Sequence, residues 1–332
     1  MHIFLKLDIL IKLKSIKKFL RYNNIIYLCK GCAKKCEQHE QPNNNRNKKN
    51  RTIHREVMIL AIRRAPQFSP NSVEKDAKIL EAVCQELKLK GHCVTTVSEE
   101  ELNNITAKNG QWNVCLSMGR LPKTLRWLEE QAGKGCIVIN NSKGIALCCN
   151  RRKLTDIFQK EHIPLPPTQG KDGYWLKRGD GVAETKGDVR FAQNDDEKEK
   201  VFRQMKADGI DDIVTSAHVK GDLIKFYGVK GSGFFRIFYP GDDGQSKFGD
   251  EQHNGKPHHY QFEMETLHKT IEYAAEISHT IVYGGDCIVK SDGTFCIIDF
   301  NDWPSFSRCR EEAAQAIAQT VEQAIRTDKN NL

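Results

Sequence analysis

Short apolar runs alternate with helical patterns in the stretch that begins near residue 56. The run at 57–62, VMILAI, predicts a buried strand, and Val73, Leu80 and Leu87 mark the apolar face of a following helix. Gly91 is expected to end that helix. Further strands are predicted at 92–97, 113–118 and 136–140, with a helix at 121–133 between the last two. This alternation predicts a small parallel α/β lobe over residues 56–141.

The pattern changes after residue 141. Residues 142–170 predict a helix-rich linker that is broken by Pro164, Pro166 and Pro167. Strands are then predicted at 173–178, 188–192, 212–219, 223–230, 233–240, 284–290 and 294–300, and helices at 195–208, at 262–278 and after Arg308. The turn SDG at 291–293 joins the last two strands as a hairpin. Residues 142–330 therefore predict an α+β domain.

Charge separates the first 55 residues from the rest. The chain has 332 residues and a formal charge of +8, but residues 1–55 hold 14 Lys or Arg against 3 Asp or Glu. The remaining residues carry 37 against 40, so the body of the protein is slightly acidic and gives no sign of a nucleic-acid partner. Oligomeric state is left open by the sequence.

The cysteines and the hydropathy bear on location. Most of the twelve Cys stand in apolar runs such as NVCLSM, where a free thiol behaves as a small buried hydrophobe. This usage fits a reducing cytoplasm, and no apolar run is long enough to span a membrane. We expect a soluble, cytoplasmic protein.

Residues 1–55 predict a basic, disordered leader. Cys29, Cys32, Cys36 and His39 have ligand types that suit zinc, but no second paired half follows, and the polar tract after them favours an accidental cluster. A basic amphipathic helix on a membrane surface is a further alternative for the opening segment. Met58 stands at the start of the first strand, so it is also a candidate initiation site.

The strongest chemical feature is the predicted hairpin at 284–301. Asp299 and Asn301 are two residues apart and so share one face of their strand, and an antiparallel partner can bring Asp286 beside them. Two carboxylates and an amide oxygen suit Mg²⁺ bound together with nucleotide phosphates. The alternative is that Asp299 caps a loop and Asp286 is only a strand-end carboxylate.

This segment, GGDCIV…FCIIDFNDWP, resembles the metal-binding hairpin of the ATP-grasp superfamily. The resemblance implies a fold in which the N-terminal α/β lobe precedes two α+β lobes that clasp ATP, with Mg²⁺ or Mn²⁺ held by Asp286, Asp299 and Asn301. The segment NRRKLTDIFQKEHIPLPPT is similar to the family's helix that begins with a nucleotide-contacting Lys, which matches Lys153.

Further ATP-binding residues follow from the same resemblance. Lys177, on YWLKRGDG, matches the strand Lys that reaches the phosphates or the adenine, and Gly179 and Gly181 match a Gly-rich loop over the phosphates. Ser216 and His218 stand where the family contacts adenine, although the usual acidic side chain is absent. Lys225 and Arg236 match basic positions that touch the phosphates or the acceptor, which makes them the candidate catalytic residues.

The resemblance leaves the reaction open. Ribosomal-protein glutamate ligases and other ATP-grasp ligases use a carboxylate acceptor, so a carboxylate–amine ligase that forms an acylphosphate is the first hypothesis. The strands HVKGDLIKFYGV and IIDFNDWPSF also look like those of inositol tris- and tetrakisphosphate kinases, so a sugar or inositol phosphate kinase is the second. A non-catalytic ATP-binding protein is the third. In each case the expected partner is a small molecule or a peptide.

Overall fold

The computed structural model describes residues 57–105, 111–243 and 253–330, which all belong to one compact unit, His54–Leu332. The predicted leader, with Cys29, Cys32, Cys36 and His39, lies outside the described residues. No helix in the described part of the chain is both long enough and apolar enough to cross a membrane. None of the nine described cysteines forms a disulfide.

The first lobe is built on a four-stranded parallel sheet in the order β2-β1-β3-β4. Its elements are β1 (Met58–Arg63), η1 (Pro66–Phe68), α2 (Val73–Leu89), β2 (Cys93–Ser98), α3 (Leu102–Ile105), β3 (Val114–Ser117), α4 (Pro122–Gly133) and β4 (Ile137–Ile139). Gly91 follows α2 with a φ of +90°, which is easy only for glycine and confirms the predicted end of the helix. The parallel α/β lobe is therefore confirmed.

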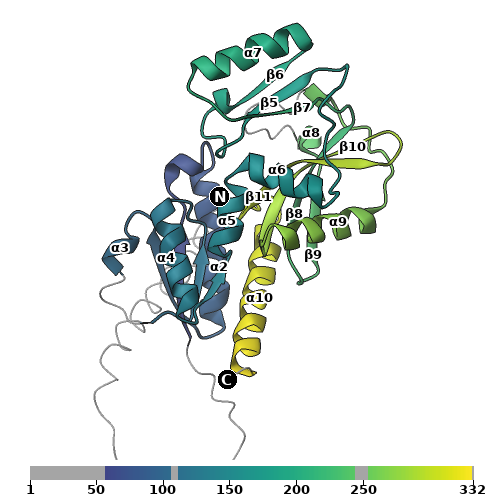
Figure 1. Ribbon diagram of the computed structural model, residues 1–332. Coiled ribbons are helices and arrows are strands. Elements are labelled where there is room, and N and C mark those ends of the chain that lie inside the picture. The colour runs from purple at the N-terminus through teal and green to yellow at the C-terminus, as the bar shows by residue number, and fades with distance from the viewer. Residues whose placement is uncertain (1–56, 106–110, 244–252, 331–332) are drawn as a thin grey trace, which may run out of the picture. The chain divides into compact units, whose positions relative to one another are not determined.

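A small antiparallel sheet follows two linker helices, as Figure 1 shows. Its elements and the linker are α5 (Ser142–Cys148), α6 (Arg151–Lys160), β5 (Tyr174–Arg178), η2 (Lys186–Asp188), β6 (Val189–Ala192), α7 (Asp195–Ala207) and β7 (Ile213–Ala217). The strand order is β6-β5-β7, and α7 covers the sheet through Met205, which is fully buried beside Tyr174 and Leu176. This is the first of the two predicted α+β lobes.

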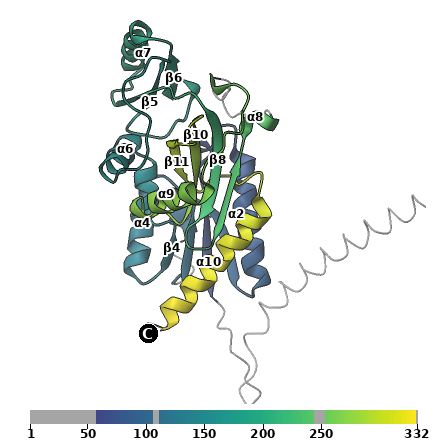
Figure 2. The same ribbon diagram turned by 90° about the vertical axis from the view of Figure 1, so that its right-hand side faces the viewer.

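The second antiparallel sheet has the order β11-β10-β8-β9. Its elements are β8 (Asp222–Val229), β9 (Phe234–Phe238), α8 (Pro240–Asp243), α9 (Met264–Ile277), β10 (Val282–Val289), β11 (Phe295–Asp302) and α10 (Arg310–Asn330). The predicted hairpin of β10 and β11 is present, and β8 pairs with β9 in an antiparallel arrangement as well. Figure 2 shows α9 and α10 lying along this sheet.

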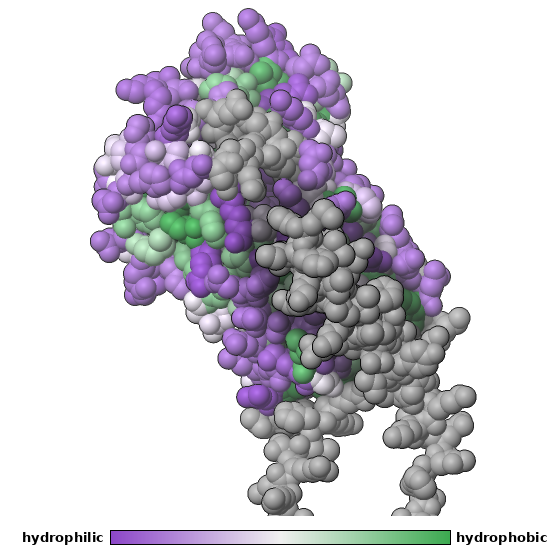
Figure 3. All heavy atoms as spheres, turned by 180° about the vertical axis from the view of Figure 1, so that it is seen from behind, coloured by the Kyte–Doolittle hydropathy of each residue, from purple (hydrophilic) through white to green (hydrophobic). Residues whose placement is uncertain are grey.

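One hydrophobic core joins the first lobe to the second antiparallel sheet. Helix α10 packs against α2, and Ile317 of α10 belongs to the same buried cluster as Leu80 of α2 and Val229 of β8. The parallel sheet ends at Ile139, close to the predicted boundary at 141/142, but the core continues past it. Seen from behind, the described surface is largely hydrophilic (Figure 3), as expected for side chains outside such a core.

A buried ionic cluster also ties the end of β11 to the first lobe. Asp302 has a fully buried carboxylate that accepts hydrogen bonds from Arg64, which follows β1, and from Arg120, which follows β3. Arg64 also donates to the backbone carbonyls of Met118 and Trp303, at 3.1 and 3.2 Å, and to the carboxylate of Asp76 at 3.2 Å. These bonds fix how β11 meets the ends of β1 and β3.

Glu99 holds the two loops that carry these arginines. Its carboxylate is fully buried and accepts from the backbone N–H groups of Ala65, Arg120 and Leu121 at 2.6 to 2.8 Å, and from the Thr124 hydroxyl at 3.1 Å. Hydrogen bonds to a charged acceptor are stronger than neutral ones, so the loops are well fixed. The arginines are thus positioned from both ends, by Glu99 at the backbone and by Asp302 at the guanidinium.

Asp302→Ala is expected to lower the free energy of unfolding by about 3–5 kcal/mol, because it leaves the buried guanidinium groups of Arg64 and Arg120 without their shared counter-charge. Urea denaturation measures the change. Glu265→Ala is the control, since Glu265 is an exposed helix residue paired with Lys269. An Asp302→Ala protein as stable as the Glu265→Ala protein would contradict the structural role of the cluster.

Candidate functional site

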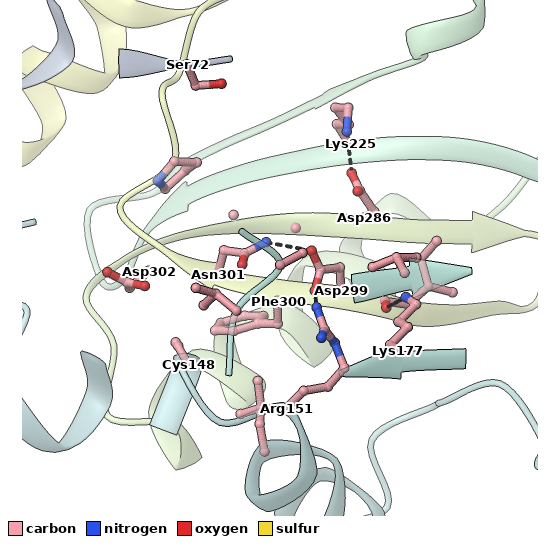
Figure 4. A pocket seen from close by; sticks show the side chains of 18 of the residues that line it. Ser72, Cys148, Arg151, Lys177, Lys225, Asp286, Asp299, Phe300, Asn301 and Asp302 are labelled. Carbon is pink, nitrogen blue, oxygen red and sulfur yellow. Dashed lines mark hydrogen bonds and ion pairs between the residues drawn. The ribbon is translucent and has the colours of Figure 1, made fainter. Parts of the chain in front are cut away.

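A cavity of about 410 Å³ opens between the two antiparallel sheets and the first lobe. Figure 4 shows part of its lining. Eight of the residues predicted from the sequence line it: Lys177, Gly181, Ser216, His218, Lys225, Asp286, Asp299 and Asn301. They come from β5, β7, β8, β10 and β11 and the loops beside these strands, so the fold collects them from distant parts of the chain.

The predicted metal ligands lie together on the β10–β11 hairpin. Asp286 stands directly opposite Asp299 in the strand register, and Asn301 follows two residues later on the same face. Asn301 Nδ2 donates to Asp299 Oδ2 at 2.8 Å, which orients the amide and leaves its oxygen for another partner. Asp286 accepts from Lys225 Nζ at 2.9 Å.

A β-bulge sets which side chains of β11 face the cavity. The register shifts between Asp286, which pairs with Asp299, and Cys287, which pairs with Ile297, so Ile298 is the extra residue. Without this shift, strict alternation would put Ile297 and Phe300 on opposite faces. Instead both are buried in the core, although Phe300 also borders the cavity, which Ile298 and Asp299 line.

The bulge also supplies a carbonyl to a cation. The Ile298 carbonyl accepts a hydrogen bond from Lys177 Nζ at 2.8 Å. Lys177 lies on β5, in the other antiparallel sheet, so this bond connects the two sheets across the cavity. The ammonium group is thereby held next to the hairpin carboxylates, as Figure 4 shows.

Arg151 supplies a second cation at the same place. It is the first residue of α6, whose N-terminus is capped by Asn150, and its Nη2 lies 3.8 Å from Asp299 Oδ1. Its Nη1 donates to the Arg178 carbonyl. Burial alone would raise the pKa of Asp299, but the charges of Arg151 and Lys177 and the Asn301 hydrogen bond outweigh it and lower that pKa. Asp299 is therefore a carboxylate at neutral pH.

Three predicted site residues lie outside the cavity lining. Lys153 is two residues beyond Arg151 on α6, about 200° around the helix, so the two side chains leave it on opposite sides. A Cβ on Gly179 would meet the Asp212 carboxylate at 2.6 Å, so the glycine there serves packing within the lobe. Arg236 turns toward α10, where its Nε donates to Glu312 at 2.9 Å.

The hairpin suits a hard divalent cation. Asp286, Asp299 and Asn301 offer two carboxylates and an amide oxygen, and the described residues hold no cluster of three or more His, Cys, Asp and Glu side chains of the kind that binds a metal by protein ligands alone. Mg²⁺ is commonly held by one or two carboxylates, water and nucleotide phosphates. The donor set fits Mg²⁺ or Mn²⁺, and the metal assignment stays a prediction.

Several lining residues were missed by the sequence reasoning. They are Arg64, Arg120, Arg151, Trp175, Asp302 and Arg308. Asp302 follows Asn301 directly, and strand alternation sends it to the buried face, where a carboxylate needs a partner. That signal could have prompted a search for buried arginines. The sequence gives no comparable sign for Arg64 and Arg120, which lie in loops 238 and 182 residues away from Asp302.

Trp175 and His218 form an aromatic end of the cavity. His218 Nδ1 lies 3.1 Å from the indole Nε1 of Trp175. An indole N–H can only donate, so Nδ1 accepts and the neutral ring carries its proton on Nε2. Burial, and then the charge of His253, lower the pKa of His218. His218 lines the cavity, so its neutral ring brings an Nε2–H donor to this end rather than an acidic acceptor.

The backbone next to His218 is already engaged. The N–H of Ala217 donates to the Pro167 carbonyl at 2.7 Å, and that of His218 donates to the Gly173 carbonyl at 2.8 Å. These two amides are therefore not available to a base bound in the cavity. The side chains of Ser216 and His218 remain as polar groups of this strand that line it.

Cys148 also lines the cavity, beside Phe300 and Asp302 (Figure 4). Burial, followed by the negative charge of Asp302, raises the pKa of this thiol well above its usual range. The thiol is therefore protonated at neutral pH. Since the thiolate is the nucleophile in cysteine chemistry, the environment of Cys148 does not favour covalent catalysis.

No protein-family model matches the sequence, and no curated protein matches it. Solved structures do resemble the fold. The D-alanine–D-alanine ligase of Bacillus anthracis complexed with ATP superposes with a TM-score of 0.59 at 13% identity, over 83% of this chain and 100% of that one. For the D-alanyl-alanine synthetase A of Vibrio cholerae the values are 0.60, 11%, 82% and 98%.

A RimK domain ATP-grasp protein of Sphaerobacter thermophilus gives a TM-score of 0.53 at 16% identity, over 79% of this chain and 98% of that one. These structures are matched over 98 to 100% of their own length and over 79 to 83% of this chain, so the likeness extends over most of the described body. The chain has the ATP-grasp fold, which confirms the fold expected from the hairpin motif.

Trp175→Phe is expected to raise the pKa of His218, because it removes the hydrogen bond that the indole N–H donates to the neutral imidazole. In the wild type the lowered pKa means that the folded state binds fewer protons at His218 than the unfolded state does. This group's contribution to stability is thus complete above its unfolded pKa, about 6.5, and is lost as the pH falls through the folded pKa. NMR titration of the imidazole measures the shift.

Trp127→Phe is the control for this titration, because Trp127 lies on α4 in the first lobe. His253→Gln removes the second cause of the shift and is also expected to raise the pKa of His218. An unchanged His218 titration in both Trp175→Phe and His253→Gln would show that the bond and the neighbouring charge do not set its protonation.

Proposed function

We propose that this protein is an ATP- and Mg²⁺-dependent carboxylate–amine ligase that works through an acylphosphate. The observation that supports this most directly is the hairpin of Asp286, Asp299 and Asn301, which faces Lys177, Arg151 and Lys225 in one cavity of an ATP-grasp fold. The structural neighbours include D-alanine–D-alanine ligases, one of them complexed with ATP, and these favour a ligase among the reactions considered.

In the proposed reaction an acceptor carboxylate oxygen attacks the γ-phosphorus of ATP. A new oxygen–phosphorus bond forms, the bond to the bridging oxygen breaks, and ADP leaves. An amine then attacks the acyl carbon, inorganic phosphate departs, and the amine loses a proton to give an amide. Catalysis of phosphoryl transfer rests mainly on positioning and on stabilising charge, which are the two things that fixed cations provide.

Each residue has a proposed part in that reaction. Asp286, Asp299 and Asn301 would hold Mg²⁺, which when bound neutralises phosphate charge. Lys177 and Arg151 are held at Ile298 and Asp299, so their charges stand beside the site where the phosphates would lie. Lys225 is placed by Asp286 at the same edge, where it faces the phosphates or the acceptor. Ser216 and His218 would contact the base.

Asp299→Asn combined with Asn301→Ala is expected to abolish the Mg²⁺-dependent part of ATP binding, because a carboxylate charge and an amide oxygen are removed from the metal site. Calorimetric titration of ATP with and without Mg²⁺ measures it. Asp292→Ala, in the turn of the same hairpin, is the control and should bind like the wild type. Folded wild-type protein that binds no ATP in Mg²⁺ would end the proposal.

The reaction class is tested by its products. A ligase is expected to release ADP and inorganic phosphate in equal amounts over many turnovers only when both a carboxylate and an amine are supplied. The phosphate-containing products are followed by ³¹P NMR, and the amide is followed by mass spectrometry. A stable phosphoester with ADP, and no free phosphate, would instead establish the kinase alternative. Tight Mg²⁺-ATP binding without ADP release, over amino acids, peptides and phosphorylated polyols, would favour a non-catalytic protein.

A further inference from the structure

The cavity has a second polar end, away from the hairpin carboxylates. It is formed by the start of α2 and by the loop after β11, and Figure 4 shows Ser72 lying well apart from Asp299 and Lys177. The charged and hydroxyl-bearing residues here are Arg64, Ser72, Lys75, Asp76, Arg120, Asp302, Ser305, Ser307 and Arg308. These residues belong neither to the predicted metal site on the hairpin nor to the aromatic end of the cavity at Trp175 and His218.

The two carboxylates at this end are already neutralised. Asp302 is shared by Arg64 and Arg120, while Asp76 accepts from Arg64 at 3.2 Å and from the Ser69 hydroxyl at 2.7 Å. Both Asp side chains are buried. Lys75 and Arg308 add positive charge at the same end, and Arg308 also lies 5.5 Å above the Phe238 ring. Four Lys or Arg residues thus line this end against two Asp residues, which favours an anion.

Hydrogen-bond donors exceed acceptors here. Two lining residues, Arg120 and Trp303, are more than nine-tenths buried, yet Arg120 Nε and Trp303 Nε1 have no hydrogen-bond partner among the described residues. A buried donor without a partner costs about 1–3 kcal/mol, so a native site normally supplies one. The buried groups that border this end of the cavity thus include more donors than the acceptors around them satisfy.

The start of α2 points to the same chemistry. This helix has 17 residues, and no side chain caps its first turn, because Ser72 at the N-cap makes no capping hydrogen bond. An uncapped helix N-terminus presents N–H groups and a partial positive charge. Glu74 lies in the same turn, but it is exposed and does not line the cavity.

We propose that this end of the cavity binds a second carboxylate of the acceptor, one that does not react. This rests on the proposed function, because it assumes that the reacting carboxylate lies beside the hairpin. The acceptor would then be a dicarboxylate, or an acidic amino acid or peptide, with one carboxylate near Lys177 and Arg151 and the other near Lys75 and Arg308. The substrate class is thus narrower than a carboxylate in general.

The test uses the full chain without nucleotide, so that anion binding is separated from ATP chemistry. Acetate, succinate, glutarate and adipate are titrated by calorimetry, and 3-phosphonopropionate is compared with succinate. At least one dicarboxylate is expected to bind about tenfold or more tightly than acetate, with an optimum chain length. Equal, weak binding of all four carboxylates would overturn the proposal, and so would a tenfold preference for the phosphonate.

Substitutions at Lys75 and Arg308 test whether the dicarboxylate binds at this end of the cavity. Lys75→Gln with Arg308→Gln is expected to weaken the best dicarboxylate about tenfold or more and to leave acetate unchanged, because charge-assisted hydrogen bonds are lost at one end only. Lys78→Gln is the matched control, since Lys78 is exposed on the same helix and does not line the cavity. If the double variant proves unfolded by circular dichroism, Lys75→Gln alone carries the test.

The two proposals fail in different ways. ATP binding that is retained in the double variant, with loss of dicarboxylate binding, supports the second-carboxylate site. Dicarboxylate binding that is equal in wild type, double variant and Lys78→Gln overturns it and leaves the ATP site untouched. Loss of ATP binding in Asp299→Asn with Asn301→Ala concerns the metal site and says nothing against this end of the cavity.

Discussion

Asp302 is the residue on which the position of the cavity depends. Its carboxylate has no exposed surface and is shared by Arg64 and Arg120, whose loops are in turn held by Glu99. A buried carboxylate is expensive unless it is paired and hydrogen-bonded, so the three elements must meet in one arrangement. Burial lowers the pKa of Arg64, helped by Arg120, whereas Asp302 raises that of Arg120 against the effect of burial. One wall of the cavity is therefore fixed before any ligand enters.

Strand β11 serves the fold and the site with alternate residues. Phe300 belongs to the hydrophobic core and Asp302 to the ionic cluster, although both also border the cavity, while Asp299 and Asn301 carry the polar groups of the predicted metal site. The bulge at Ile298 corrects the alternation so that Ile297 can also be buried, and it frees a carbonyl for Lys177. Asp299 and Asn301 are thus held on a strand whose neighbouring residues, Phe300 and Asp302, are fixed by the core and by the ionic cluster. Functional groups placed on such rigid strands keep their geometry.

Short-range patterns explain why much of this could be predicted. Period-two alternation and the SDG turn were enough to place Asp286 beside Asp299 and Asn301, because a hairpin is a local structure. Local patterns did not reveal the bulge, which follows from how the core is packed. The family resemblance pointed to Lys153 on α6, whereas Arg151 of the same helix lines the cavity, and the side of α6 that faces the cavity depends on where the helix docks. Arg64 and Arg120 reach Asp302 from loops far away in sequence, and no local pattern announces such contacts.

The charged residues that line the cavity are arranged differently at its two ends. Seven Lys or Arg and four Asp residues line it. Near the hairpin, Lys225 is held by Asp286, Lys177 by the Ile298 carbonyl and Arg151 by Asp299. The phosphates of the proposed ATP would therefore meet cations that are already in place. Such fixed cations need little reorganisation when charge develops. At the α2 end both carboxylates are already paired with arginines, so the proposed second carboxylate would meet mainly positive charge there. Under the two proposals, phosphates with a metal would lie at the hairpin end of the cavity, and an additional carboxylate would lie at the α2 end.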